Sequence, residues 1–201
     1  MSHPTLHLVL AAALVALPGG AVAADPPRVV IEQTTSMVLD VLGDHALSSA
    51  DKRRRIEGVV YARVDFDVLS RLVMAQNWDR LSPPQKTAFL EEFRRHLSVT
   101  YGKRLESYRN ERVEITGERD EARGDHTVKT KILRGGPDDI LVDYRLRRSG
   151  DRWLIIDFII EGVSLVANYR SQFQEIMGNG GANHLIELLR EKNASGEPLK
   201  S

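Results

Sequence analysis

Two carboxylates beside an apolar segment are the strongest candidates for chemistry in this chain. Asp157 and Glu161 lie four residues apart at the end of the apolar run 153–160, so in a strand both side chains would point to one face. A carboxylate in an apolar cavity can have a raised pKa and act as a general base. The alternative is structural: Asp157 bonds backbone or an arginine, and Glu161 caps the following helix. The structural interpretation is favoured.

Other catalytic and metal-binding groups are isolated. The sequence has no Walker loop, no dinucleotide-binding glycine motif and no nucleophile elbow. It has no cysteine, which excludes disulfides, thiolate metal sites and a lipoprotein anchor. Four histidines follow the first 24 residues, and none has a partner at metal-ligand spacing: His45, His96, His126 and His184. We therefore predict no cofactor, no metal and no enzyme activity.

The N-terminal segment has the organisation of a secretory signal peptide. Residues 1–24 contain no Lys, Arg, Asp or Glu, and Leu8 to Leu17 is an unbroken apolar run. A Pro-Gly-Gly break and the small-x-small sequence 21–23 follow it. The run is too short to span a bilayer. We predict a signal peptide over 1–24, cleaved near Ala23/Ala24, and a mature protein outside the cytoplasm.

The composition describes an ordinary globular protein. The chain is 42% apolar and 28% charged, and its 28 basic residues equal its 28 acidic residues. The overall charge therefore provides no field that would attract nucleic acid, and no nucleic-acid binding is predicted. We expect a soluble monomer with one α+β domain over 25–195 and a flexible tail over 196–201.

Two periodicities divide that domain. Helical spacing dominates 27–108, where Ser48 or Ser49, Asp65 and Ser82 can each cap a helix. The last of these opens with a Ser-Pro-Pro-Gln capping box, and its apolar stripe runs from Phe89 to Tyr108. Alternation of period two over 111–161 predicts an antiparallel meander of about four strands. Further helices are expected over 163–193, interrupted at the glycine-rich 178–181.

The predicted fold class is therefore α+β. A curled antiparallel sheet of about four strands is wrapped by a long amphipathic helix and further helices, in a half-open cone. The fourth strand, 153–160, is apolar on both faces, so both should be covered.

Two segments resemble a known family. Residues 157–173 read DFIIEGVSLVANYRSQF, which closely resembles the segment that closes the sheet in the MlaC family. The earlier motifs F-x-x-LSRLVM (66–74), SP-x-Q (82–85), F-x-x-x-F (89–93) and TY-x-x-x-L-x-x-Y (100–108), with Trp78, are similar to the central helices of that family. The resemblance covers about 40–195.

This resemblance implies a periplasmic phospholipid carrier of the Mla ABC transport system, also known as the toluene-tolerance auxiliary family. The implied partners are phospholipid, an inner-membrane ABC transporter with a ring-forming lipid-binding subunit, and an outer-membrane lipoprotein–porin complex. The implied role is shuttling lipid between the outer and inner membranes to maintain outer-membrane asymmetry.

A carrier requires an apolar cavity, and the chain has more apolar faces than its sheet alone needs. The residues predicted to line the cavity are Leu72, Val73, Phe93, Leu97, Tyr101, Val142, Tyr144, Ile155, Ile159, Val163 and Val166. Arg147 is the predicted head-group contact, and Val163→Glu is expected to remove lipid binding. Sequence alone leaves other interpretations open: an ordinary filled core, an adaptor or chaperone without a small ligand, or a cone-fold enzyme using Asp157 or Glu161.

Two basic stretches complete the candidates. Arginines at 145, 147, 148 and 152 form a basic hairpin that could be solvated, contact a phosphate at a cavity mouth, or dock an acidic partner. The run 53–55 has no interleaved aromatic residues and is interpreted as a solvated helix face.

Overall fold

The computed structural model describes residues 25–105, 111–134 and 139–199. The predicted signal peptide, Tyr108 and the turn at 135–138 lie outside the described residues. The elements are α1 (Pro27–Gly43), α2 (Ser49–Arg63), α3 (Phe66–Met74), η1 (Ala75–Arg80), α4 (Pro83–Leu105), β1 (Arg112–Asp120), η2 (Ala122–Gly124), β2 (His126–Leu133), β3 (Ile140–Ser149), β4 (Arg152–Ile160), β5 (Val163–Ser164) and α5 (Leu165–Ser195).

The helix starts follow the capping residues in the sequence. The Ser48 hydroxyl accepts a hydrogen bond from the first turn of α2, and the Asp65 carboxylate does the same for α3. At α4 the capping box is reciprocal: the Ser82 N–H donates to Gln85 Oε1 at 2.9 Å, and the Gln85 N–H donates to Ser82 Oγ at 3.4 Å. Each cap satisfies N–H groups that the first helical turn leaves without partners.

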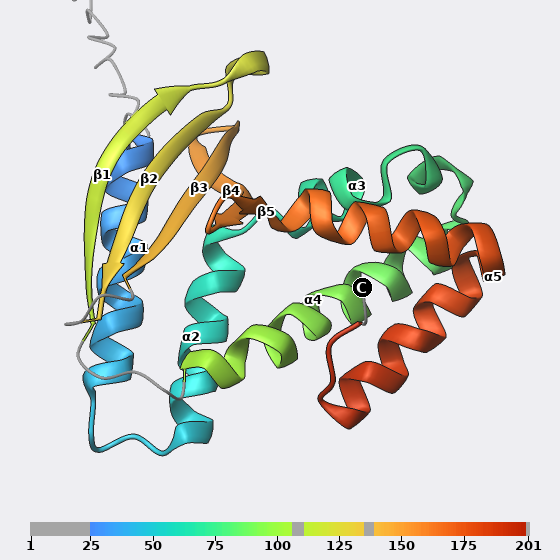
Figure 1. Cartoon of the computed structure of the whole chain (residues 1–201), viewed down its shortest axis with the longest axis horizontal. Helices are drawn as coiled ribbons and strands as arrows, with labels where there is room; N and C mark the ends of the chain where they lie inside the picture. The colour runs from blue at the N-terminus through green and yellow to red at the C-terminus, as the bar shows by residue number, and fades with distance from the viewer. Residues whose placement is uncertain (1–24, 106–110, 135–138, 200–201) are drawn as a thin grey trace, which may run out of the picture.

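The sheet is an antiparallel meander in the order β1-β2-β3-β4-β5, and it curls around α1 (Figure 1). The predicted α+β class and curled antiparallel sheet are confirmed, with one short strand added. The sequence predicts a helix from Val163 onward, whereas Val163 pairs with Ile160 in the structure and forms β5. The reason is the turn Glu161-Gly162, whose φ angles of 49° and 78° reverse the chain tightly enough to form a hairpin.

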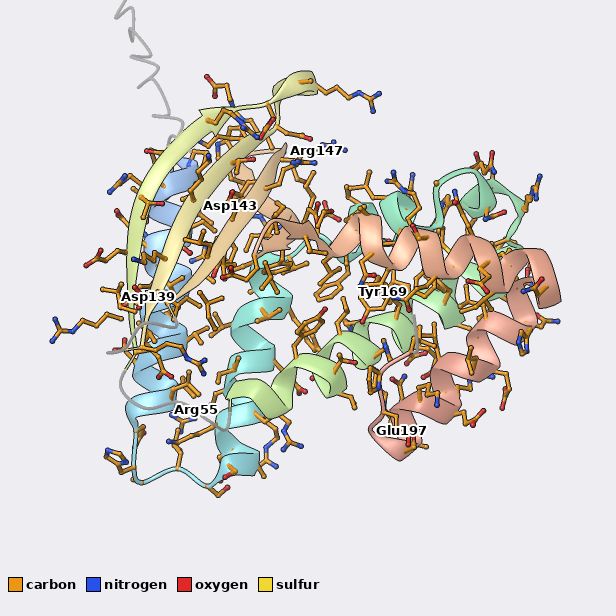
Figure 2. The ribbon with its side chains drawn as sticks, viewed as in Figure 1. Arg55, Asp139, Asp143, Arg147, Tyr169 and Glu197 are labelled. Atoms are coloured by element: carbon orange, nitrogen blue, oxygen red, sulfur yellow. The ribbon has the colours of Figure 1, made fainter. Side chains whose placement is uncertain are left out.

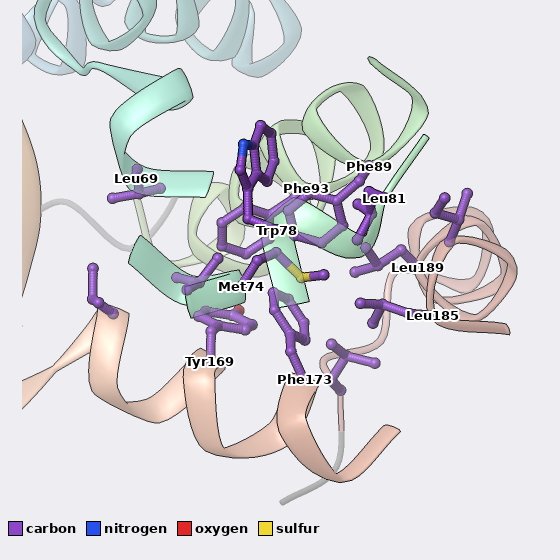
Figure 3. Close-up of a cluster of buried hydrophobic side chains, with 14 of the residues drawn as sticks. Leu69, Met74, Trp78, Leu81, Phe89, Phe93, Tyr169, Phe173, Leu185 and Leu189 are labelled. Atoms are coloured by element: carbon purple, nitrogen blue, oxygen red, sulfur yellow. The ribbon is translucent and has the colours of Figure 1, made fainter. Parts of the chain in front are cut away.

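The helices α3, α4 and α5 enclose one hydrophobic core, here called the helical core (Figure 3). The rings of Phe89, Phe93, Tyr169 and Phe173 pack at centroid separations of 5.1 to 5.5 Å. The buried residues of the helical core are Leu69, Val73, Met74, Trp78, Leu81, Phe89, Phe93, Leu165, Val166, Tyr169, Phe173, Leu185, Ile186, Leu189 and Leu199.

A second, smaller core lies between the sheet and α1, and is here called the sheet core. Its buried residues are Val30, Ile31, Val64, Val128, Leu146 and Ile155. The two cores divide the molecule into a helical part and a sheet part, and α3 and α5 join them through their contacts with β4. The helix α4 extends from the helical part toward α2 (Figure 1).

The glycine-rich segment 178–181 breaks α5 sharply. Gly181 has φ 70° and ψ −172°, a conformation that residues with a Cβ hardly adopt, and the chain reverses there (Figure 1). The second arm of α5 thereby returns Leu185 and Leu189 to the helical core. Beyond α5, Gly196 is left-handed and Leu199 is only 8% exposed. Leu199 packs into the helical core, and the flexible tail over 196–201 stays a prediction.

Candidate functional site

A cavity of about 620 Å³ lies between the inner face of the sheet and helices α1, α2 and α4. It is lined mainly by aliphatic and aromatic side chains. Representative lining residues are Val38 and Leu39 of α1, Val60 of α2, Leu97 of α4, Ile132 of β2 and Ile160 of β4.

The apolar stripes of the helices build this cavity because each is longer than the core it serves. On α1, Val30 and Ile31 are buried in the sheet core, whereas Val38 and Leu39 lie two turns further along and face the cavity. On α4, Phe89 and Phe93 fill the helical core, whereas Leu97 and Tyr101 continue the same stripe into the cavity wall. The strands contribute through alternation: Val128 is fully buried and Ile132, on the same face, reaches the cavity.

Tyr144 and Phe158 form an uncharged, aromatic part of the cavity wall. Tyr144 projects from β3 and packs edge-on against Phe158 of β4, with ring centroids 5.6 Å apart. Burial raises the pKa of the Tyr144 phenol to about 12, so the hydroxyl stays neutral at physiological pH.

Four of the twelve predicted site residues line the cavity. They are Leu97, Tyr101, Tyr144 and Ile155, which come from α4, β3 and β4. The structure therefore brings together residues that the sequence separates by up to 58 positions, as the predicted wrapping of the sheet by the long helix requires.

The other residues predicted to line the cavity from helices lie in or against the helical core. Val73, Phe93 and Val166 are buried in the helical core, and Leu72 packs against it. These positions were predicted because they are apolar and helically spaced, but such spacing does not distinguish a face that meets another helix from a face that meets a cavity.

Three predicted sheet positions also fall outside the cavity wall. Val142 is buried between its strand neighbours, and its carbonyl accepts a hydrogen bond from the Thr130 hydroxyl at 2.7 Å. Ile159 lies on the face of β4 opposite to Phe158 and Ile160. Val163 is 60% exposed on β5, so the premise that Val163→Glu would place a charge inside the cavity is not met.

Arg147 is engaged with a carboxylate on the outer part of the sheet. Its Nε and Nη2 donate to the two Asp125 oxygens at 2.6 and 2.8 Å, and this hydrogen bonding raises the already high pKa of the guanidinium. Figure 2 shows Arg147 at the end of the sheet far from α4. It does not line the cavity, because Leu146, its neighbour on β3, takes the inward direction.

The two candidate catalytic carboxylates have structural roles. Asp157 is 2% exposed and accepts hydrogen bonds from the Ser164 hydroxyl at 2.6 Å and the Val166 N–H at 3.0 Å, which fixes the start of α5. Glu161 is exposed and accepts from the Leu141 N–H at 2.6 Å. Asp157 thus bonds backbone as expected, whereas Ser164, not Glu161, caps α5. Among the described residues no group of three His, Cys, Asp or Glu could hold a metal ion.

Among the lining residues that were not predicted from the sequence, the largest group comes from α1 and α2. Val38 and Leu39 of α1, with Ile56 and Val60 of α2, form the wall opposite the sheet. The apolar stripes of α1 and α2 are visible in the sequence. Each stripe needs something to pack against, and this need was the signal that could have placed both helices at the cavity.

The comparisons with known proteins agree with this geometry. The family model described as MlaC protein matches residues 32–191. The chain belongs to the MlaC family. Toluene tolerance protein Ttg2D from Pseudomonas putida is 29% identical over 183 residues, covering 84% of this chain and 80% of the relative.

A solved structure shares the MlaC fold seen here. It is the phospholipid-binding protein from Ralstonia solanacearum, determined in complex with a phospholipid, which is similar at a TM-score of 0.76 with 25% sequence identity. The match covers 84% of this chain and 97% of that one. Within the described part of this MlaC-family chain, no helix is both long and apolar enough to cross a membrane.

Proposed function

We propose that this chain is a soluble periplasmic phospholipid carrier, which shuttles lipid between the outer and inner membranes and so maintains the lipid asymmetry of the outer membrane. The observation that carries the proposal is the apolar cavity of about 620 Å³ between the sheet and α1, α2 and α4. Family membership and the phospholipid held by the Ralstonia relative support it.

The size of the cavity argues for a guest. The cavity is partly open to solvent, so it holds water when no ligand is bound. Its mainly apolar walls offer that water few hydrogen-bond partners. Replacing the water by an apolar ligand is therefore favourable, because the surfaces of the walls and of the ligand are both removed from water.

The volume also fits hydrocarbon. If a methylene takes about the volume of one water, about 30 Å³, the cavity has room for about 20 methylenes. At about 0.8 kcal/mol each, their removal from water is worth about 16 kcal/mol. A bilayer offers the tails the same free energy of removal from water, so the exchange of lipid between protein and membrane is close to neutral. Docking to a partner can then direct loading or release. The contacts with the tails are proposed to come from Leu97, Tyr101, Tyr144 and Ile155, with the α1 and α2 wall.

The partners follow from the family. The carrier is proposed to receive and deliver lipid as a monomer at an outer-membrane lipoprotein–porin complex and at an inner-membrane ABC transporter with a ring-forming lipid-binding subunit. Residues 1–24 are proposed to direct export and to be cleaved near Ala23/Ala24. No cofactor and no catalysis are required, because exchange is driven by differential binding alone.

A transfer assay tests the function. Donor vesicles carrying a labelled phospholipid are separated from acceptor vesicles by a membrane that passes the protein but no vesicle. The mature protein is expected to carry label across at a rate proportional to its concentration. Transfer no faster than in protein-free buffer, by a protein that is folded, would contradict the proposal.

A further inference from the structure

The cavity is closed at the end that faces the sheet core. Three of its lining residues, Thr34, Val64 and Ile155, are at most 6% exposed, and Val64 and Ile155 also belong to the sheet core. The sheet-core residues Ile31 and Val128 are fully buried and are not among the lining residues. The cavity therefore ends at Thr34, Val64 and Ile155, which are here called the floor.

The opposite end of the cavity carries exposed lining residues. The helix α2 runs from the exposed Arg53 to the floor residue Val64, and β2 runs from the buried Val128 through Ile132 toward the exposed Arg134. Arg53 and Arg134 thus line the cavity at the ends of these elements that lie farthest from the floor. A lipid that keeps its head group in water at this end points the ends of its tails toward the floor.

Main-chain pairing holds the floor in place. Val64, which follows the last residue of α2, forms a parallel β-bridge with Ile155, and the Asp65 N–H donates to the Ile155 carbonyl at 2.9 Å. The Asp65 carboxylate in turn caps α3 by accepting from the Val68 N–H at 2.9 Å. On its other side Ile155 is paired with Leu146 of β3. Because the backbone ties Val64 and Ile155 to their neighbours, the floor cannot recede to admit a longer tail.

The walls of the cavity have little freedom to repack. The described lining residues include no methionine, the side chain that allows a binding surface to adapt to different ligands. Many of them are β-branched, such as Val60, Ile132 and Ile160, and β-branched side chains are restricted in χ1. A cavity with a fixed floor and stiff walls accepts a limited length of hydrocarbon.

We propose that the floor measures the length of the acyl chains, so that Val64 and Ile155 determine which phospholipids the protein prefers. The proposal rests on the proposed carrier function and names the property of the lipid that the same cavity selects. Tails shorter than the cavity leave the floor uncovered, whereas longer tails keep methylenes in water. A bilayer buries every methylene, so each methylene that does not fit weakens binding by about fourfold.

A competition among chain lengths tests the floor. Delipidated protein is equilibrated with vesicles that contain equal amounts of phosphatidylcholines with even-numbered chains of ten to twenty carbons. The bound lipid is identified by native mass spectrometry. The lipid bound by the wild type is expected to peak at one chain length, and beyond the peak the bound amount should fall by about fourfold for each methylene left outside.

Two substitutions of Val64 should move this peak in opposite directions. Val64→Ala removes two carbons from the floor and makes room for about two methylenes, so the next longer lipid should gain by up to about tenfold relative to the wild-type peak. Val64→Phe adds four carbons, raises the floor and should move the peak to shorter chains. A variant that only loosened the fold would not reverse the direction of the shift, so the pair distinguishes a specificity role from a structural one.

Val128→Ala provides a matched control. It removes the same two carbons from the sheet core, where Val128 is fully buried, but Val128 is not among the lining residues. The peak should stay where the wild type has it, and a thermal melt establishes that each variant is folded. An equal shift in Val128→Ala would reduce the effect to a loosened core and overturn the proposal.

The remaining outcomes separate the floor from the carrier function. Wild-type protein that binds all chain lengths in the proportions offered would overturn the floor proposal and leave the carrier function intact. Folded Val64 variants that keep the wild-type peak, or that both shift it in one direction, would also overturn the floor proposal. Wild-type protein that binds none of the lipids would contradict the carrier function itself.

Discussion

Replacing Ile160 by glutamate tests the cavity at a single cross-strand pair. Ile160 and Val163 are directly paired across the β4–β5 hairpin, yet Ile160 lines the cavity and Val163 is 60% exposed. Ile160→Glu should therefore place a carboxylate among the lipid tails. Val163→Glu makes the same chemical change one strand away, in water, and should leave lipid binding unchanged.

The size of the effect follows from the cavity volume. An ionised carboxylate has about four lone-pair sites and so holds about four waters. At about 30 Å³ each they take about 120 Å³, a fifth of the 620 Å³ cavity. They displace about four methylenes, each worth about 0.8 kcal/mol, or about 3 kcal/mol in total. That corresponds to about a hundredfold weaker binding.

The assay is a titration of delipidated protein with an acyl-labelled fluorescent phospholipid at pH 8, which favours the ionised form of the new carboxylate. Circular dichroism and a thermal melt establish that each variant is folded. A second variant, Val38→Glu on the opposite wall, should show a similar loss and guards against a local defect in β4. Wild-type affinity in folded Ile160→Glu, or an equal loss in Val163→Glu, would refute the placement of the tails.

Three further predictions concern the frame around the cavity. Gly181→Ala should lower the free energy of unfolding by about 1–3 kcal/mol, because the φ of 70° and ψ of −172° at this position strain any residue with a Cβ. Gly178→Ala, where a Cβ meets no neighbour, should not destabilise the protein. Equal stabilities of the two variants in chemical denaturation would contradict this. Asp157→Asn should cost about 2 kcal/mol by weakening the two hydrogen bonds that start α5, and the exposed Asp151→Asn should cost nothing measurable in the same melts. Burial lowers the pKa of His96 below its usual 6.5, so the unfolded chain takes up a proton at a higher pH than the folded protein does. The stability should therefore fall as the pH drops below about 6.5. The melting temperature of the variant His96→Gln should depend less on pH between pH 7 and 5.

Local sequence signals predicted much of the frame. Ser48, Asp65 and the Ser82-Gln85 box each begin a helix where expected, because a cap is decided by a few adjacent residues. Strict alternation of apolar and polar residues predicted the strands, because this pattern too is a property of adjacent residues. The start of α5 was misplaced by two residues because the left-handed Glu161 is decided by the hairpin it closes, which no local preference of glutamate indicates.

The cavity wall was harder to predict than the elements that form it. On α4 a single periodic stripe serves the helical core at Phe93 and the cavity at Leu97, one turn later. The difference depends on which elements pack against each turn of α4, which is a tertiary property. Arg147 was chosen as a head-group contact for its charge, but the partner that determines its role, Asp125, lies 22 residues away.

The most direct test is the mass of the native protein. Native mass spectrometry of the protein, purified from cells without detergent, should show a complex whose excess mass is released on gentle activation as intact phospholipid. A folded protein that is detected only at the mass of its bare polypeptide, and that also takes up no phospholipid from vesicles, would contradict the account.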